Sequence, residues 1–424
     1  MRRLFPLLMV LALVAGACGD DATPSSTTGP TSTLAPRGVD GEIAALVAEA
    51  ERVRGLEFFD EPTVTVVTQA ELAERVRLQI EEDLDPEEVA VLQRLYELLG
   101  LLDGTVDLGQ AYRDLYAEQV GGFYDGDTGE MVVSAGGSGL SALSKTIVVH
   151  ELIHALTDQH YGFDDRSTAL VDAKQFEEAV ALQALVEGDA TYYQLIYMQE
   201  LPVDEQLDAI QESLGVDTAV IDSLPAWFAE DLTFPYDSGF GFVSRLVQEH
   251  GIVGVNQAYE RPPTTTEQIL HPEKYFAQEP AREVSLPAAE VAGYEVFEEG
   301  IFGEWNLMLY LLDGVSRGNA VVGAGGWGGD QYRLYWNGTD LLFAYLYEGD
   351  TPRDAEEFAE YLIDSVAARM DVGSPQGGDV TTFPGGSAYA YVERSGQRVL
   401  FVGAFDRNSG ISLVESLRSG GALP

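Results

Sequence analysis

The segment VVHELIHALTDQH, residues 148–160, places two histidines and a glutamate inside an apolar stretch. The whole chain of 424 residues has 5 histidines, and His150 and His154 are two of them. Residues four apart lie on one face of a helix, so both imidazoles can point at a single ion. The apolar flanks predict a buried helix. A buried Glu–His–His group without an ion costs on the order of several kcal/mol, so the segment predicts a metal site.

The pattern H-E-x-x-H indicates zinc as that metal. Imidazole nitrogen suits a borderline-soft cation, and zinc in a catalytic site keeps one position open for water. Glu151 lies beside that position, where its carboxylate can act as a general base. His150 and His154 are therefore the predicted zinc ligands, and Glu151 is the predicted catalytic residue.

A third ligand has to come from another element. The segment ALVEGDATYY, residues 184–193, supplies Glu187 on the next predicted long helix. Gly188 follows it and removes a side chain where a second helix would have to approach closely. Spacing alone leaves Glu177, Glu178 and Asp189 open as alternatives.

Three short motifs in order resemble the gluzincin metallopeptidases, especially their aminopeptidase branch. They are HELIH at residues 150–154, VEGDATYY at 186–193 and PYDSGFGFV at 235–243, and the likeness covers roughly residues 110–250. HELIHALTD is also similar to the active-site helix of thermolysin. The resemblance implies a zincin-like fold, with the third ligand in the E-G-x-A segment, which is Glu187.

The resemblance also implies that Tyr236, in FPYDSG, donates a hydrogen bond to the oxyanion formed during hydrolysis. His271 is the rival for that role, with a capping or surface histidine as its alternative. Asp158 is expected to orient an imidazole. The segment between His154 and Glu187 is longer than usual in those families, and residues 158–179 are expected to form a loop over the cleft.

A hairpin is predicted just before the zinc helix, where DGDTGE separates two β-prone runs. Its second strand, MVVS at residues 131–134, is a candidate for pairing with an extended substrate backbone. The alternative is an ordinary core strand.

The N-terminus, MRRLFPLLMVLALVAGACGD, has the two arginines, apolar run and small residues of an export signal. Cys18, the only cysteine, follows VAGA, and the segment resembles a bacterial lipoprotein signal. We therefore predict a signal peptide at residues 1–17, lipid attachment at Cys18 and a location on the extracytoplasmic face of the cell membrane. An ordinary signal peptide is the alternative. Residues 18–39, rich in Pro, Ser and Thr, predict a flexible tether.

Composition narrows the classes of partner and fold. The net charge of -46 disfavours nucleic acid as a partner, because an acidic surface repels phosphate. With 424 residues and a hydrophobic content of 46%, the chain is long and apolar enough to form one or two domains, each with a hydrophobic core. We predict an α+β protein with two parts. Residues 40–284 form a mainly helical zincin-like domain with a small sheet, and residues 285–424 form a smaller α+β region. Within the second part, Gly325–Tyr332 is predicted to form a turn.

These features together predict a membrane-anchored lipoprotein that binds Zn²⁺ and hydrolyses a peptide or protein substrate. The alternative is a zincin-like lipoprotein that captures a ligand without hydrolysing it. Peptide cleavage that depends on Glu151 separates the two.

Overall fold

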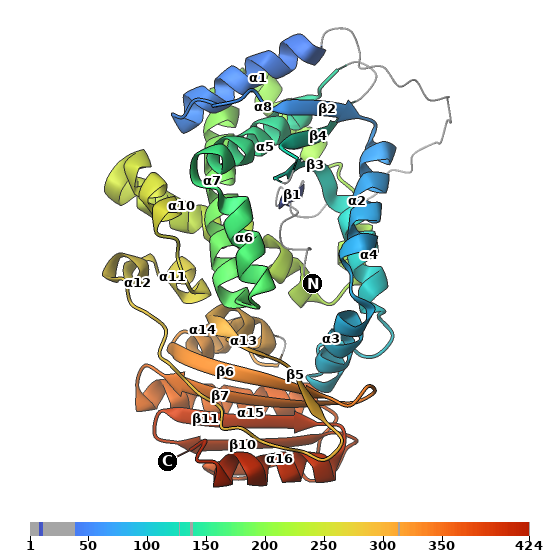
Figure 1. Ribbon diagram of the computed structural model, residues 1–424, viewed down its shortest axis with the longest axis vertical. Helices are drawn as coiled ribbons and strands as arrows, with labels where there is room; N and C mark the ends of the chain where they lie inside the picture. Colours follow the sequence, from blue (N-terminus) through green and yellow to red (C-terminus); the bar gives the residue numbers. More distant parts are fainter. Residues whose placement is uncertain (1–7, 12–38, 127, 136–138, 313, 424) are drawn as a thin grey trace.

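A computed structural model of the chain describes residues 8–11, 39–126, 128–135, 139–312 and 314–423 (Figure 1). It shows a mixed α+β protein in which helices dominate up to residue 277 and a large antiparallel sheet follows. The α+β prediction is confirmed at this level. No helix in these ranges combines the length and hydropathy that crossing a bilayer requires. Cys18, nearly all of the predicted tether and most of the predicted signal lie outside the described residues.

A small sheet lies beside the predicted zinc helix. Its strands in the described ranges are β1 (Leu8–Leu11), β2 (Thr63–Val67), β3 (Val120–Asp125) and β4 (Glu130–Ser134), in the order β1-β3-β4-β2. The strands β2 and β4 are parallel, and β3 runs antiparallel to β4 and to β1. The predicted hairpin is therefore confirmed as β3 and β4.

The structure overturns the prediction that MVVS pairs with substrate. These residues belong to β4, whose backbone is already paired with β3 on one side and β2 on the other. Met131, Val132 and Val133 are buried, as expected of a core strand. The strand at the edge of the hairpin is β3, and the strand that pairs with it, β1, falls in the predicted signal segment.

The helical part surrounds α5, which lies against the small sheet with α7 beside it (Figure 1). The helices are α1 (Val39–Arg54), α2 (Gln69–Asp83), α3 (Pro86–Leu98), α4 (Leu108–Gln119), α5 (Ala142–Tyr161), α6 (Phe163–Asp172), α7 (Phe176–Glu200), α8 (Val203–Ser213), α9 (Ala219–Ser223), α10 (Ala226–Glu260), α11 (Thr266–Leu270) and α12 (Pro272–Ala277). This arrangement puts both long helices that carry the predicted ligands in the interior.

Residues 158–179 do not form the expected loop over a cleft. They contain the end of α5, the whole of α6 and the start of α7. Gly162 ends α5 in the left-handed conformation, with φ of 59°, which suits glycine. Phe163, Leu170 and Val171 are then buried in the main apolar cluster. Their spacing of seven and eight residues is that of one helical face, which explains why this segment folds as a helix.

The C-terminal region is built on a second sheet. Among the described residues after 285 its strands are β5 (Glu295–Gly300), β6 (Trp327–Trp336), β7 (Leu341–Gly349), β8 (Gln376–Gly377), β9 (Val380–Thr382), β10 (Tyr389–Ser395) and β11 (Arg398–Ala404). They pair antiparallel in the order β5-β6-β7-β11-β10-β9-β8. The helices are α13 (Gly303–Leu311), α14 (Arg317–Ala324), α15 (Pro352–Arg369) and α16 (Arg407–Ser419).

Helices cover both faces of this sheet, which explains its nearly continuous apolar strands. In β7, Leu342, Ala344 and Leu346 join the cluster that contains the apolar residues of α16. Phe343 and Tyr345, which alternate with them, join the cluster that contains those of α15.

The predicted turn at Gly325–Tyr332 is wrong, because β6 begins at Trp327. The glycines there serve close packing. A Cβ added at Gly329 would lie 2.4 Å from the carbonyl oxygen of Arg282, and the Arg282 N–H donates to the Gly328 carbonyl at 2.7 Å. The absence of side chains at Gly328 and Gly329 thus lets the backbone at Arg282 pack directly against β6.

The largest buried apolar cluster contains residues from both sides of residue 285. Leu95 of α3 and Phe234 of α10 belong to it, together with Phe343 of β7 and Phe358 of α15. The helical part and the C-terminal sheet therefore share apolar packing. The domain division at residue 285 stays a prediction.

Candidate metal centre

The helix α5 carries the first two predicted ligands through the core. Its N-terminus is capped by Ser141, whose hydroxyl accepts from the N–H of Ser144 at 3.1 Å. Every residue from Thr146 to Thr157 is buried. His150, Glu151 and His154 therefore lie on a buried stretch of helix whose other residues are apolar apart from Thr146 and Thr157.

The structure brings Glu187 of α7 to these histidines. The carboxylate oxygen Oε2 of Glu187 lies 3.1 Å from Nε2 of His150 and 3.4 Å from Nε2 of His154. One ligand atom from each of the three residues lies within 4.8 Å of the other two, and all three residues are buried. We call His150, His154 and Glu187 the ligand cluster.

Hydrogen bonds around His150 determine which of its nitrogens faces Glu187 as an acceptor. The hydroxyl of Thr146 donates to the Leu143 carbonyl at 2.8 Å, so it accepts from Nε2 of Gln194 at 3.4 Å. The amide oxygen of Gln194 then faces Nδ1 of His150 at 3.1 Å, and Nδ1–H is the donor. In neutral imidazole Nε2 is left with a lone pair directed at a carboxylate oxygen, and either a proton or a metal cation between them would satisfy both atoms.

Burial and neighbouring charges act on the protonation of His150 and Glu187. Burial lowers the pKa of His150, which favours neutral imidazole. Burial acts to raise the pKa of Glu187, but charge and hydrogen bonds from the imidazoles in their protonated form outweigh it and lower the pKa to about 2, so the carboxyl group is ionised. Two neutral imidazoles and a carboxylate are the deprotonated forms that bind a metal.

Three buried atoms of the cluster have no hydrogen-bond partner among the described residues. They are Oε1 of Glu187 and both ring nitrogens of His154, of which Nε2 lies 3.4 Å from Oε2 of Glu187. Leaving a buried polar atom unsatisfied costs about 1–3 kcal/mol. A His₂Glu donor set of this kind matches a catalytic zinc site, in which three protein ligands leave a further position open. The residues present therefore fit a zinc ion.

The other carboxylates weighed as third ligand are engaged or placed elsewhere. Asp189 lies two residues beyond Glu187, on the other side of α7, where its Oδ2 accepts from Nε of Arg54 at 2.9 Å and from the hydroxyl of Tyr259 at 3.0 Å. Glu177 accepts from both the N–H and the hydroxyl of Thr266.

Among the described residues, no other three His, Cys, Asp or Glu side chains bring their ligand atoms within 4.8 Å of one another, so Glu178 belongs to no such group.

Asp158 does not orient an imidazole. Its carboxylate accepts from the hydroxyl of Tyr124 at 3.1 Å and from the N–H of Asp164 at 3.0 Å. It ties the end of α5 to β3 and to α6 instead. The hydrogen bond that positions a ligand histidine comes from Gln194, which the sequence analysis missed. Gln194 lies two helical turns after Glu187 on α7, and this spacing was the available signal.

Tyr236 lies next to the ligand cluster. Its ring centroid is 6.3 Å from that of His150, and the two rings are inclined by 31°. It belongs to α10, which packs against α7. The structure therefore places Tyr236 beside a predicted ligand, on a different helix from Glu151.

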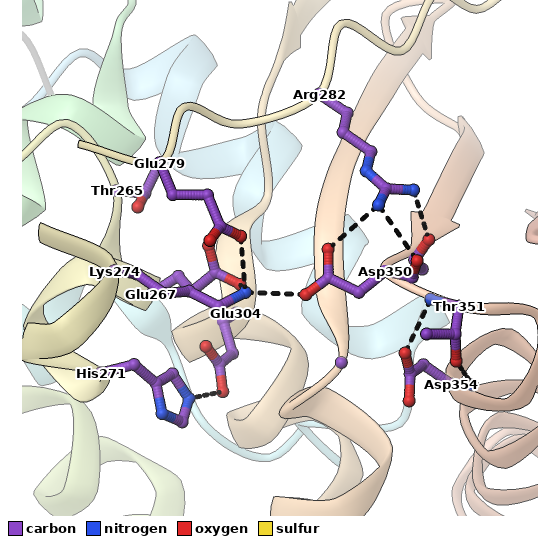
Figure 2. Close-up of polar contacts among 12 residues, drawn as sticks. Thr265, Glu267, His271, Lys274, Glu279, Arg282, Glu304, Asp350, Thr351 and Asp354 are labelled. Carbon is purple, nitrogen blue, oxygen red and sulfur yellow. Dashed lines mark hydrogen bonds and ion pairs between the residues drawn. The ribbon is translucent and has the colours of Figure 1, made fainter. Parts of the chain in front are cut away.

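His271 has a separate partner. Figure 2 shows its imidazole directed at Glu304, with Nε2 of His271 2.9 Å from Oε1 of Glu304. This hydrogen bond is the main reason why the pKa of His271 is raised. The pair links the junction of α11 and α12 to α13, next to Lys274, which bonds Asp350 at 2.7 Å. His271 thus takes part in packing between the helical part and the C-terminal region.

In the comparisons with known proteins, only the C-terminal region has a match. A family model described as a domain of unknown function (DUF8575) matches residues 294–413. This range spans β5 to β11 and does not include the ligand cluster. No curated protein and no solved structure matches the chain.

Proposed function

We propose that this protein is a zincin-like, zinc-dependent metallopeptidase that hydrolyses peptide bonds while a lipid on Cys18 holds it at the extracytoplasmic face of the membrane. The observation that carries the proposal is the ligand cluster. Its histidine Nε2 and carboxylate Oε2 atoms converge inside the protein without a cation among their protein partners. The resemblance of the three motifs to gluzincins supports the same activity.

His150, His154 and Glu187 would hold the ion. When bound, zinc would supply Lewis-acid polarisation of the substrate carbonyl and lower the pKa of water at the site. Gln194 keeps Nδ1 of His150 protonated, which directs Nε2 to the ion. These roles require neutral imidazoles, consistent with the lowered pKa of His150.

Two other residues would act on the substrate. Glu151, the residue after His150 on α5, would take a proton from the attacking water on its carboxylate and deliver it to the leaving amine. Tyr236 would donate its hydroxyl hydrogen to the carbonyl oxygen as negative charge develops there. Glu151 and Tyr236 approach from α5 and α10, so the substrate carbonyl would lie between them.

The edge of β3 offers a place for an extended substrate backbone. It pairs antiparallel with β1, residues 8–11, which belong to the predicted signal segment. Removal of that segment would free the backbone groups of β3 for a peptide. The strand lies against α5 one turn before His150: a Cβ at Gly121 would be 2.7 Å from Cδ1 of Ile147.

Metal analysis together with a peptide-library digest tests the proposal. The chain beginning after Cys18 should contain about one zinc ion and cleave peptides. Glu151→Gln keeps the shape of the side chain and should keep the zinc, while turnover falls by about 10²-fold or more because the base is lost. A zinc-loaded parent that cuts no peptide would reject the peptidase assignment and favour ligand capture.

A further inference from the structure

A pocket lies at the junction between the helical part and the C-terminal region. Its volume is about 290 Å³, and its described walls come from α3, α4, α7, α10, β5, α13, β6 and β7. A volume near 300 Å³ is at the small end of ligand sites and suits one large side chain better than a long lipid. We call it the junction pocket.

Two helices connect the wall of the junction pocket with the ligand cluster and Tyr236. Phe176, Val180 and Gln183 line it from α7, and their spacing of four and three residues follows one helical face. Glu187 continues the same face, one turn or about 6 Å beyond Gln183. On α10, Pro235 lines the pocket and directly precedes Tyr236.

Aromatic rings form much of the wall. They include Tyr96, Trp227, Phe234, Trp305 and Tyr332. The faces of such rings attract cations, and their apolar surface packs well against a hydrocarbon stem. The wall therefore favours a group that is both apolar along its length and positive at its end.

All ionisable groups in the described wall, tyrosines aside, are acidic. They are Glu88, Asp231 and Glu298, and no lysine, arginine or histidine accompanies them there. Trp305 donates its Nε1–H to Asp231 at 3.0 Å, and the hydroxyl of Tyr332 donates to Glu298 at 2.6 Å. Both partners are neutral, so the pocket itself supplies no positive charge for these two carboxyl groups.

Asp231 lines the pocket and is also exposed to solvent. Desolvation by the surrounding protein raises the pKa of its carboxyl group. Burial raises the pKa of Tyr96, and the negative charges of Asp231 and Glu298 raise it further. Both carboxyl groups therefore act on the same region of the pocket, near Tyr96.

We propose that the junction pocket binds a lysine or arginine side chain of the substrate, beside the peptide bond that is cleaved. This rests on the proposed peptidase function. The aliphatic stem packs along the aromatic wall, and the cationic end bonds Asp231 and lies near Glu298. The C-terminal sheet region, which supplies Glu298, Trp305 and Tyr332, thereby determines substrate specificity.

A pair of probes of nearly equal shape tests this independently of cleavage. Benzamidine carries a positive amidinium group, and benzamide is its neutral counterpart. Calorimetric titration of the full-length chain in lipid nanodiscs should give binding of benzamidine at least about 10-fold tighter than of benzamide, as expected for a charge-assisted hydrogen bond. Equal affinity, or tighter binding of benzamide, would overturn the proposal in favour of an apolar occupant.

Asp231→Asn identifies the site of binding. Asparagine keeps an oxygen for Trp305, so the fold is retained, but benzamidine affinity should fall about 10-fold and that of benzamide should stay the same. Asp208→Asn, on the exposed side of α8, removes one charge away from the pocket and should leave both affinities unchanged. An equal loss in the two variants would point to general electrostatic attraction and reject the pocket as the binding site.

The peptide-library digest separates failure of this proposal from failure of the proposed function. Cleavage next to lysine or arginine in the parent, with that preference reduced in Asp231→Asn, supports both. Cleavage without a preference for basic residues would reject the pocket assignment and leave the peptidase intact. Asp231-dependent binding of benzamidine without any cleavage would reject the peptidase and leave the pocket as a site for cations.

Discussion

Gly188 on α7 and Gly239 on α10 bring two helix backbones into direct contact. A Cβ at Gly188 would lie 2.2 Å from the carbonyl carbon of Gly239, and one at Gly239 would lie 2.0 Å from the carbonyl oxygen of Ala184. The expectation that Gly188 admits a second helix is confirmed. Glu187 directly precedes Gly188, and Tyr236 lies three residues before Gly239. This contact therefore sets the spacing between a predicted ligand and the predicted oxyanion donor.

Gly239→Ala should force α10 away from α7. We expect the free energy of unfolding to fall by about 1–3 kcal/mol, because an added methyl group must displace backbone. Zinc affinity should fall as well, since Glu187 moves with α7. Denaturant unfolding and metal content measure the two effects.

Gly241→Ala is the matched control in the same helix. Nothing lies within 4 Å of the Cβ that it would add, and Gly241 is exposed. Alanine at this position should be neutral or should stabilise the helix by up to about 1 kcal/mol. Similar losses in both variants would show that the contact between the two glycines has no special role.

Glu187→Ala should weaken zinc binding strongly, because it removes the one carboxylate in the ligand cluster. Glu178→Ala, on the same helix but partly exposed, should bind zinc like the parent. Equilibrium dialysis against a competing chelator measures both affinities. If Glu187→Ala retains parental affinity while Asp189→Ala loses it, the third ligand is Asp189.

Tyr236→Phe should slow peptide cleavage about 10²-fold and change the Michaelis constant little. This pattern is expected when a hydrogen bond forms only in the transition state. His271→Ala should keep the parental rate, because His271 bonds Glu304 instead. Steady-state kinetics of both variants decide which residue stabilises the oxyanion. A normal rate in Tyr236→Phe together with a collapsed rate in His271→Ala would assign that role to His271.

Stability should decrease as pH rises from about 4.5 to about 8, because the buried carboxyl of Glu177 favours its neutral form. Burial raises its pKa from 4.5 to about 8, and the negative charges of Asp330 and Glu304 add to this. Folding therefore takes up a proton between these two pKa values. The contribution of Glu177 to the free energy of unfolding is fully present below about pH 4.5 and is lost as pH rises through about 8. Burial also raises the pKa of Glu267 to about 7 and of Asp330 to about 6, with the same sign.

Glu177→Gln tests this contribution. Glutamine imitates the neutral acid, so the variant should unfold like the parent near pH 5 and be more stable by on the order of 2–4 kcal/mol near pH 9. Glu178→Gln removes a charge from the next residue and serves as control. Parallel melting curves for parent and Glu177→Gln from pH 5 to 9 would contradict the prediction.

Cys18→Ser should move the protein from the membrane to the soluble fraction, since it removes the predicted lipid attachment site. Fractionation of cells with and without detergent measures this. Unchanged detergent dependence would count against lipidation.

Much of the local structure followed from the sequence. The segment around residues 148–160 and the segment with Glu187 were predicted as helices, and the hairpin before α5 was predicted from its turn residues. The errors arose where distant segments meet. MVVS reads as a strand, but only the pairing of β2 with β4 places it inside the sheet. GGWGGDQY reads as a turn because its glycines allow a turn, yet they accommodate Arg282 in a strand.

The sequence by itself determined what lies within one helix. His150 and His154 share a face because they are four residues apart, and the apolar residues around them require burial. The choice between Glu187 and Asp189 could be decided only by the tertiary structure, because both lie on α7 and both are buried. Arg54 of α1 neutralises Asp189 on one side of that helix, while α5 presents its imidazoles to Glu187 on another. Periodicity determines the faces of a helix, but only the packing of distant segments decides which partner each face meets.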